Sequence, residues 1–225
     1  GLTMRLLKEP YLGNSESVND AGKVAQKLGI DHQYLDFSDE FRHKVVDYFA
    51  ESYIKGLTPT PCVLCNRHIK LGLLAEQALL NGADVIVTGH YADVQKVNGQ
   101  IELHRAKDLV RDQSYFLFDV EKKFLNLLRC PLAQFSKNET RQIVKDAGVE
   151  IFDKPDSQDI CFVQNGKYAD LIAKLKPDYL CSEGDIVNRE GKVLGQHNGI
   201  INYTIGQRRG LGIGGGTIYY VLKID

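Results

Sequence analysis

The feature that most constrains the fold is a regular alternation of strand-like and helix-like apolar patterns over the first 90 residues. Residues 1–7 and 30–37 predict strands, and the stretches between and after them repeat apolar residues at helical spacing. Gly29 and Asn81-Gly82 end two of the predicted helices. Val85-Ile86-Val87 is short, continuous and β-branched, which is typical of a parallel strand covered on both faces. The alternation therefore predicts an α/β fold with a doubly wound parallel sheet.

The following segments predict smaller elements. Val94 to Leu103 carries Asn98-Gly99 between alternating residues, which predicts a β-hairpin. Ser136 and Glu139 form a capping box that opens a helix closed by Gly148. Residues 167–175 predict one more short helix. We expect one α/β domain over residues 1–181.

From about Ser182 the pattern changes to short apolar runs separated by glycines. These runs cover 185–187, 191–194, 200–204 and 218–222. They predict a small all-β module over residues 182–225.

Composition excludes several classes of protein. Lys+Arg number 28 against 29 Asp+Glu, a net charge of −1 over 225 residues, so the chain is not a globally basic nucleic-acid binder. No apolar run approaches the roughly 18 residues of a membrane span. Five cysteines are an odd number without the density of a disulfide scaffold, which indicates a reducing compartment.

Two proline-stiffened turns carry cysteines. Residues 58–62 are Thr-Pro-Thr-Pro-Cys, and Cys65 completes a Cys-x-x-Cys pair. The helix predicted next places Cys65 at or near its N-terminus, where the helix dipole with Arg67 and Lys70 favours a thiolate. Its apolar stripe is predicted from Ile69, Leu73, Leu74, Ala78 and Leu80. A second proline-stiffened turn ends in Cys161. Together, Cys62, Cys65 and Cys161 would suit a sulfur-transfer pair or a three-cysteine cluster. The Cys-x-x-Cys pair alone is also compatible with half a zinc site.

Two further motifs carry ligand-binding chemistry. Gly89-His90 follows the strand at 85–87, and ligands of such sheets bind at the carboxyl ends of the strands. Arg208-Arg209, flanked by glycines, suits a phosphate contact. Each alone is better explained as an ordinary surface turn or a solvated loop. No Gly-x-x-x-x-Gly-Lys-Ser/Thr follows the glycine-rich stretch at 212–216, so a Walker phosphate loop is excluded.

In combination these motifs resemble the tRNA-specific 2-thiouridylases. The motifs occur in order over nearly the whole chain: Thr60-Pro61-Cys62-Val63-Leu64-Cys65-Asn66, Thr88-Gly89-His90-Tyr91-Ala92, Arg111-Asp112-Gln113-Ser114-Tyr115-Phe116-Leu117, Lys154-Pro155-Asp156-Ser157-Gln158-Asp159-Ile160-Cys161-Phe162 and Tyr203-Thr204-Ile205-Gly206-Gln207-Arg208-Arg209-Gly210-Leu211. The resemblance implies an adenine-nucleotide alpha hydrolase-like fold. It also implies ATP-dependent transfer of sulfur to C2 of the wobble uridine of tRNA, with Mg²⁺.

The resemblance assigns roles by matching motif positions. Cys65 is implied as the nucleophile, and Cys161 as the residue that takes a persulfide from an upstream carrier or cysteine desulfurase relay; the two would form a disulfide on sulfur release. Met4 and Gly89 are implied near the ATP base. The implied contacts to tRNA and its flipped-out base come from Thr60, Pro61, Cys62, His90, Arg111, Asp112, Gln113, Arg208 and Arg209. The expected substrates are the Lys, Glu and Gln isoacceptors.

Two departures from the family pattern matter. The Ser-Gly-Gly-x-Asp-Ser pyrophosphate loop and the C-terminal barrel that the resemblance implies are not in this sequence, so we expect a fragment. Some members carry Asp where Cys62 stands here. Cys62, Cys65 and Cys161 could therefore hold a [4Fe–4S] cluster with one open iron, and the cluster and persulfide mechanisms both stay open. Cys130 and Cys181 match no motif and are interpreted as structural.

Two other classes of function compete with the thiouridylase. A non-catalytic RNA-binding module would use the three cysteines with His68 or His90 as a structural zinc site. A small-molecule enzyme of the same ATP-pyrophosphatase superfamily is opposed by the cysteine pair and the Ile-Gly-Gln-Arg-Arg block. We expect a bacterial cytoplasmic protein, with a mitochondrial homologue as the alternative.

Overall fold

The structure is a computed structural model. It describes residues 1–8, 15–149, 160–163, 168–179 and 182–225. Within these residues no helix has the length and apolar character needed to cross a membrane.

The chain forms two compact units. The first comprises residues 1–44 and 62–158, and the second comprises residues 45–61 and 159–225. The segment just before the cysteines therefore groups with the C-terminal part of the chain. The expected domain boundary at residue 181 stays a prediction.

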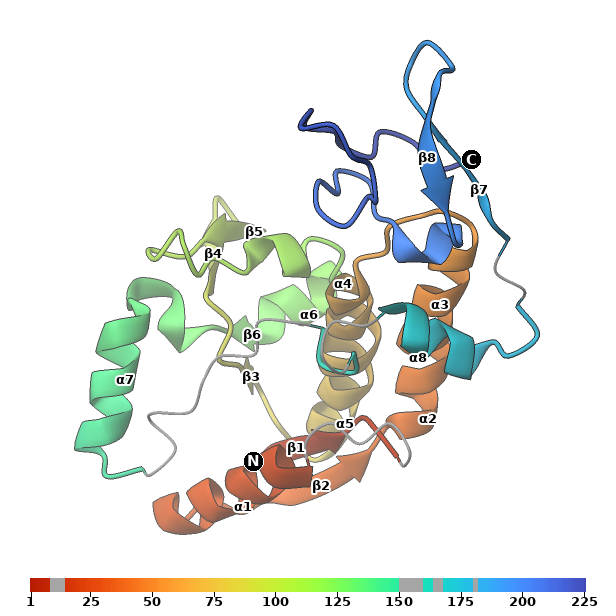
Figure 1. Cartoon of the computed structure of the whole chain (residues 1–225). Helices are drawn as coiled ribbons and strands as arrows, with labels where there is room; N and C mark the ends of the chain where they lie inside the picture. Colours follow the sequence, from red (N-terminus) through yellow and green to blue (C-terminus); the bar gives the residue numbers. More distant parts are fainter. Residues whose placement is uncertain (9–14, 150–159, 164–167, 180–181) are drawn as a thin grey trace. The chain divides into compact units, whose positions relative to one another are not determined.

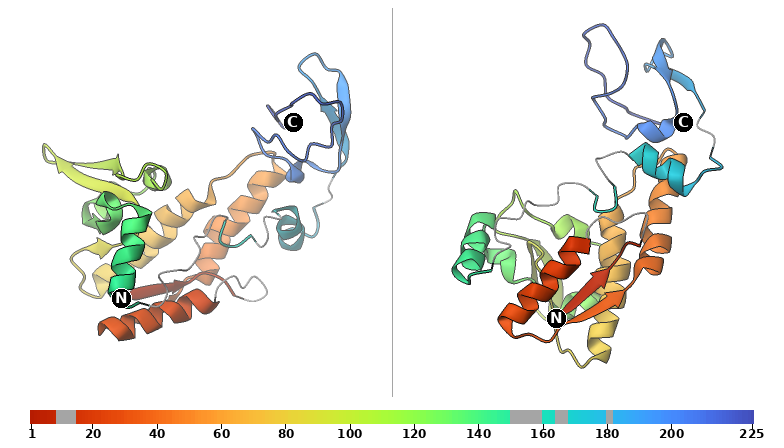
Figure 2. Two further views of the ribbon diagram at one scale, coloured as in Figure 1. Left: turned by 60° about the vertical axis from the view of Figure 1, so that its left-hand side comes forward. Right: turned by 60° about the horizontal axis from the view of Figure 1, so that its bottom comes forward.

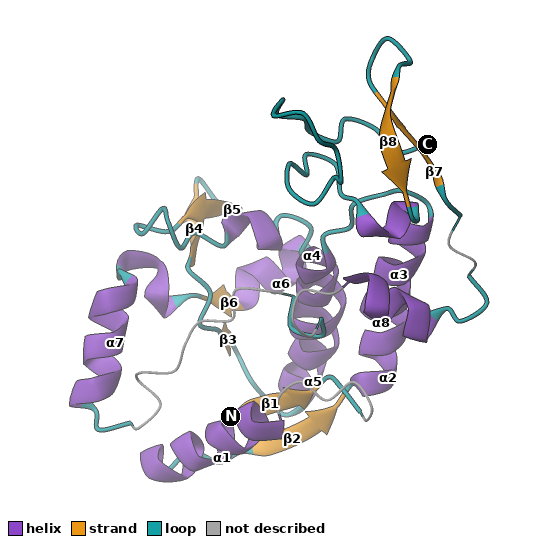
Figure 3. Ribbon diagram, in the orientation of Figure 1, coloured by secondary structure: helices purple, strands orange, loops and turns teal. Residues whose placement is uncertain are grey.

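The first unit is built on two pairs of parallel strands, as the alternating pattern predicts. β1 (Leu2–Arg5) pairs with β2 (Gln33–Asp36), and α1 (Ser15–Leu28) lies between them in the sequence (Figure 1). β3 (Ile86–Val87) pairs with β6 (Leu128–Arg129). Figure 2 shows α1 lying beside the β1–β2 pair in both views. Figure 3, with the strands in orange, shows that the described strands form short separate pairs rather than one continuous sheet.

The strand β3 is covered on one face only, so the prediction that both faces are buried is wrong. Ile86 is 7% exposed and packs in a core that includes Leu71, Leu117 and Leu128. Side chains alternate along a strand, so the neighbouring valines point the other way. Val85 and Val87 are 41% and 63% exposed, because no described element buries that face.

The helix that carries the Cys-x-x-Cys pair changes its winding and has a kink at Leu71, where φ is −112° and ψ is 25°. It runs through α4 (Pro61–Leu64), the π-helical segment η2 (Cys65–Leu73) and α5 (Leu74–Leu80), and Gly82 follows with φ +84°. A wider π turn shifts later side chains around the axis. The apolar stripe expected from a regular α-helix is therefore wrong at its end, where Leu80 is 80% exposed.

The remaining elements of the first unit follow the local sequence signals. β4 (Ala92–Val97) and β5 (Gln100–Arg105) form the predicted hairpin, with Asn98 and Gly99 both at positive φ. α7 (Lys137–Asp146) has the predicted capping box of Ser136 and Glu139. The other elements are α2 (Ser38–Phe41), η1 (Arg42–Val46), η3 (Ser114–Leu117), α6 (Lys122–Leu127) and η4 (Pro131–Gln134).

The second unit contains a pair of packed helices and a short hairpin. α3 (Asp47–Ile54) lies against α8 (Tyr168–Leu175) through stacked Tyr53 and Tyr168 rings. β7 (Gly184–Val187) and β8 (Val193–His197) form the hairpin.

Two predicted strands of the β module are wrong. Residues 200–202 form the 3₁₀ turn η7, which follows Gly199 at φ +122°. Residues 218–222 are extended in pattern, yet their described ladder is limited to two hydrogen bonds that join Val221 to Gly206 and Gln207. A strand needs a neighbouring strand to satisfy its backbone, and here a glycine-rich turn takes that place.

Candidate functional site

The cysteine pair lies within the first two turns of one helix. This helix begins at Pro61, a residue suited to the first turn because it has no N–H to leave unpaired. Cys62 is therefore the residue next to the helix start and is exposed, whereas Cys65 is one turn further and only 6% exposed. Cys65 thus lies near the N-terminus of this helix, as predicted, one turn after its first residue.

The positive charge of Lys70, one turn further along this helix, lowers the pKa of two residues of the site, Cys62 and His90. Burial of the thiol raises the pKa of Cys62, although the residue as a whole is exposed, and the charge of Lys70 opposes that rise. Burial, together with the smaller effect of the Lys70 charge, lowers the pKa of His90 from 6.5 to about 4. His90 is therefore neutral at pH 7 and acts as a hydrogen-bonding group rather than a cation.

Two polar contacts tie the cysteine helix to the loop that follows β5. Asn66 Nδ2 donates to the Phe116 carbonyl at 2.9 Å, and Arg67 forms an ion pair with Asp119 at 2.7 Å. The Asn66 side chain is 2% exposed, and its Oδ1 has no hydrogen-bond partner within the described residues. Because Arg67 is engaged by Asp119, Lys70 is the cation of this helix that acts on Cys62.

The Arg-Asp-Gln motif is divided between internal bonding and exposure. Asp112 accepts hydrogen bonds from Ala106 N and Ser114 Oγ at 2.8 and 2.7 Å. Gln113 pairs with Tyr91 twice, since its Oε1 accepts from Tyr91 N at 2.9 Å and its own N donates to Tyr91 O at 2.7 Å. Arg111 is exposed. The structure thus brings this loop to the Gly89-His90-Tyr91 turn, while a contact of the three residues with tRNA stays a prediction.

The two residues expected near the ATP base lie on parallel strands or at their ends. Met4 is half-buried on β1, and Gly89 is exposed just after β3. A Cβ at Gly89 would meet only Leu132 Cδ1 at 3.9 Å, so neither backbone strain nor crowding requires glycine there. Their role in binding ATP stays a prediction.

In the second unit, the segment before the cysteines is joined to the Ile-Gly-Gln-Arg-Arg loop. Ile205 N donates to Thr58 Oγ1 at 3.4 Å, and the hydroxyls of Tyr53 and Thr204 lie 3.3 Å apart. This is the clearest meeting of two motifs that are far apart in sequence. Thr60 of the same segment is half-buried.

The side-chain amide of Gln207 shapes that loop from within. Its Oε1 accepts from Thr204 N at 2.9 Å, and its Nε2 donates to the Arg209 carbonyl at 2.9 Å. Arg208 and Arg209 are exposed. An internally braced loop that displays two guanidinium groups suits a phosphate backbone.

Cys161 is exposed, whereas the next residue is buried. Phe162 is 5% exposed and packs edge-on against Phe49 at 5.2 Å between ring centroids. That anchor fixes the chain beside an accessible sulfur. The rest of this motif, residues 154–159, and Cys181 lie outside the described residues.

Among the described residues, no group of three or more His, Cys, Asp or Glu side chains is gathered closely enough to hold a metal ion. Cys62 and Cys65 belong to the first unit and Cys161 to the second, so a cluster held by these three cysteines stays a prediction.

Sequence reasoning missed three positioning residues that lie inside the quoted motifs. Asn66 donates to Phe116, 50 positions away, whereas Thr88 and Gln207 bond to residues two or three positions away in their own motifs. The only sequence signal for the three was their presence within polar motifs, next to residues with assigned chemistry.

The fold and site define a class of protein. The parallel α/β unit, with polar loops after its strands, is a HUP-type nucleotide domain, and a small β module follows it. The chain belongs to the family described as tRNA methyl transferase HUP domain, whose pattern matches residues 4–165. Residues 174–225 match the family described as tRNA methyl transferase PRC-barrel domain.

Curated relatives are similar over most of the chain. A protein named tRNA-specific 2-thiouridylase MnmA from Methylobacterium sp. (strain 4-46) is 50% identical over 211 residues, 93% of this chain and 55% of the relative. The protein of the same name from Rickettsia conorii is 49% identical over 212 residues, 93% of this chain and 56% of the relative. The chain thus spans about half the length of the curated relatives it matches. The resemblance drawn from the motifs is confirmed.

Proposed function

We propose that the protein containing this chain replaces the C2 oxygen of the wobble uridine of tRNA with sulfur, at the expense of ATP. The observation that carries the proposal is a buried Cys65 and an exposed Cys161 in a chain that is 50% identical over 211 residues to a relative named 2-thiouridylase. Sulfur transfer explains the thiols better than the methyl transfer in the family's description, because methylation of a base nitrogen or oxygen needs no thiol.

The chemistry starts with activation of a poor leaving group. The C2 carbonyl oxygen of uracil attacks the α-phosphorus of ATP and releases pyrophosphate, which converts the oxygen to an adenylate. Met4 and Gly89 would lie near the adenine, and Mg²⁺ would accompany the phosphates. His90, neutral at pH 7, would donate or accept one hydrogen bond from the extruded base rather than compete as a cation.

Sulfur delivery then uses both cysteines. A persulfide carrier supplies sulfane sulfur to Cys161, whose exposure suits contact with another protein. The terminal sulfur attacks C2 and displaces AMP, which leaves a disulfide between C2 sulfur and Cys161. The Cys65 thiolate attacks the Cys161 sulfur and releases 2-thiouridine, so the two cysteines end oxidised as a disulfide that a thiol reductant must reduce.

The tRNA contacts divide between the two units. Arg111 and His90 with the Asp112-Gln113 loop would receive the base, together with Thr60, Pro61 and Cys62. Arg208 and Arg209 would contact phosphates, since both are exposed on a loop braced by Gln207. The Lys, Glu and Gln isoacceptors are the expected tRNAs, and a bacterial cytoplasm is the expected location because the relatives named above are bacterial.

The test is single-turnover thiolation of unmodified tRNA by the full-length protein, with ATP, Mg²⁺ and a persulfide donor, read by mass spectrometry of nucleosides. We expect 2-thiouridine, lost in C65A and in C161A and kept in C181A, the matched cysteine outside every motif. A methylated uridine, or thiolation unchanged in C65A, would contradict the proposal.

The same preparation separates the two sulfur sources. Iron and acid-labile sulfide are measured after anaerobic purification. Retained thiolation in C62A without iron supports the persulfide route. Stoichiometric iron and sulfide, lost with activity in C62A, would assign the sulfur to a cluster. Stoichiometric zinc without thiolation would support the RNA-binding alternative.

A further inference from the structure

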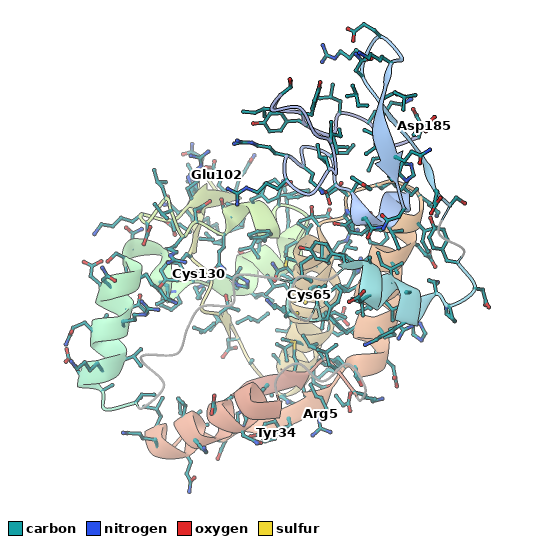
Figure 4. The ribbon with its side chains drawn as sticks, in the orientation of Figure 1. Arg5, Tyr34, Cys65, Glu102, Cys130 and Asp185 are labelled. Carbon is teal, nitrogen blue, oxygen red and sulfur yellow. The ribbon has the colours of Figure 1, made fainter. Side chains whose placement is uncertain are left out.

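Three polar side chains form a hydrogen-bonded chain at one edge of the β3–β6 pair. Thr88 Oγ1 lies 3.0 Å from His90 Nδ1 and 3.7 Å from Cys130 Sγ. Thr88 follows β3 and Cys130 follows β6, so the parallel pairing brings them to the same carboxyl edge. Figure 4 labels Cys130 in this region, apart from Cys65 on the long helix. The sequence alone predicted a structural role for Cys130 and no hydrogen-bond partner.

The direction of the protons along this chain follows from acceptor strength. The threonine hydroxyl has one proton, which it can donate to the imidazole nitrogen or to the sulfur. Imidazole nitrogen is a strong acceptor and sulfur a weak one, so the hydroxyl donates to His90 Nδ1. The Cys130 thiol then donates to Thr88 Oγ1. Burial and nearby Asp93 raise the pKa of Cys130, so the thiol keeps its proton at neutral pH and has it available to donate.

We propose that Thr88 and Cys130 are positioning residues that hold His90 as the neutral tautomer with its proton on Nε2. A nitrogen that accepts a hydrogen bond carries no proton, so the ring proton of a neutral His90 lies on the opposite nitrogen. The described part of the chain contains no hydrogen-bond partner of Nε2. His90 thus presents one N–H donor.

The chemical partner of this donor is a carbonyl oxygen. This assignment rests on the proposed function, in which the carbonyl oxygen belongs to the extruded uracil. A neutral N–H donor would bind that oxygen without protonating it, which leaves the C2 oxygen nucleophilic toward ATP. Lys70, Asp93 and Cys130 are the charged or titratable groups that act on this cluster.

The direct test is ¹⁵N NMR of histidine-labelled full chain at pH 7, with the His90 signals assigned by their loss in H90Q. We expect one neutral form, protonated on Nε2. T88V removes the donor to Nδ1 and should give a mixture of the two tautomers, whereas T88S keeps the hydroxyl and should retain one. T3V is the matched control, because Thr3 Oγ1 bonds to His32 Nε2 at 2.8 Å and its loss should move only the His32 signals.

Other results overturn the inference. Wild-type His90 protonated on Nδ1 would reverse the proton direction, and unchanged His90 signals in T88V would remove Thr88 from the role. C130A should shift the His90 signals in the same sense if Cys130 orients the threonine. Unchanged His90 signals in C130A would remove Cys130 from the role.

Thiolation kinetics test the consequence separately. T88V should lower kcat/KM for tRNA about threefold to tenfold, the effect of losing one hydrogen bond, with recovery in T88S. A fixed Nε2–H tautomer without any thiolation supports this inference and refutes the proposed function. Thiolation with an unaffected tautomer in T88V refutes this inference alone.

Discussion

Protonation of His90 should make the stability of the first unit depend on pH. Burial and Lys70 lower its pKa from 6.5 to about 4. Between these values the unfolded chain binds the proton and the folded chain does not, so stability falls as pH decreases through this window and is fully present above pH 6.5. The difference corresponds to about 3 kcal/mol lost at the acidic end.

The assay is urea unfolding followed by circular dichroism at pH 7 and pH 5, for the wild-type chain and H90Q. Burial also lowers the pKa of His68, and carboxylates titrate in the same range, so the raw slope contains other groups. The change in unfolding free energy between pH 7 and pH 5 is therefore measured for both chains, and the H90Q value is subtracted from the wild-type value. This subtraction removes the contribution of the other titrating groups. About 1–2 kcal/mol should remain at pH 5, because part of the window lies below that pH. A difference near zero would refute the reasoning.

Three further predictions follow from contacts in the site. G72A places a Cβ 2.7 Å from a backbone oxygen of the same π-wound helix and should lower the free energy of unfolding by about 1–3 kcal/mol. G89A is the control, because its Cβ would make only ordinary contacts, and it should leave the free energy of unfolding unchanged. Equal urea midpoints for the two variants would contradict this prediction. N66A leaves a buried carbonyl unpaired and should destabilise the chain by about 1–3 kcal/mol, measured the same way, and a neutral effect would show that the bond is dispensable. R208A with R209A should lower the slope of log affinity for tRNA against log salt by about two, measured by filter binding, and an unchanged slope would exclude phosphate contacts.

Local sequence signals predicted the local structure well. Gly29 ends α1 with φ +65°, and the four apolar residues Phe41, Val45, Val46 and Phe49 are all buried as their helical spacing predicts. Asn98-Gly99 forms the hairpin turn. These features depend on neighbours within a few residues, so a pattern of that length carries the information.

Errors arose where a distant partner decides the outcome. Val85 and Val87 have the composition of a buried strand, but no described element covers their face. Residues 218–222 alternate like a strand and hydrogen-bond chiefly to a turn. Leu80 is misplaced because η2 is wound as a π-helix, and no side-chain pattern reports the extra residue in that turn.

Residues that share one motif have different structural roles in the candidate site. Arg111, Asp112 and Gln113 form one motif, yet two of the three use their side-chain oxygens to hold the loop and the turn at Tyr91. The same holds for Gln207, which braces the loop that exposes Arg208. Bracing side chains and exposed arginines therefore occur within one motif, and on the proposed function a fixed backbone would hold each guanidinium in place for its ligand. If this division is correct, D112N should disturb the loop and weaken thiolation through misplacement, whereas R111A should weaken tRNA binding and leave the fold intact. Hydrogen exchange of the 106–117 amides distinguishes them, and equal exchange in both variants would contradict the division.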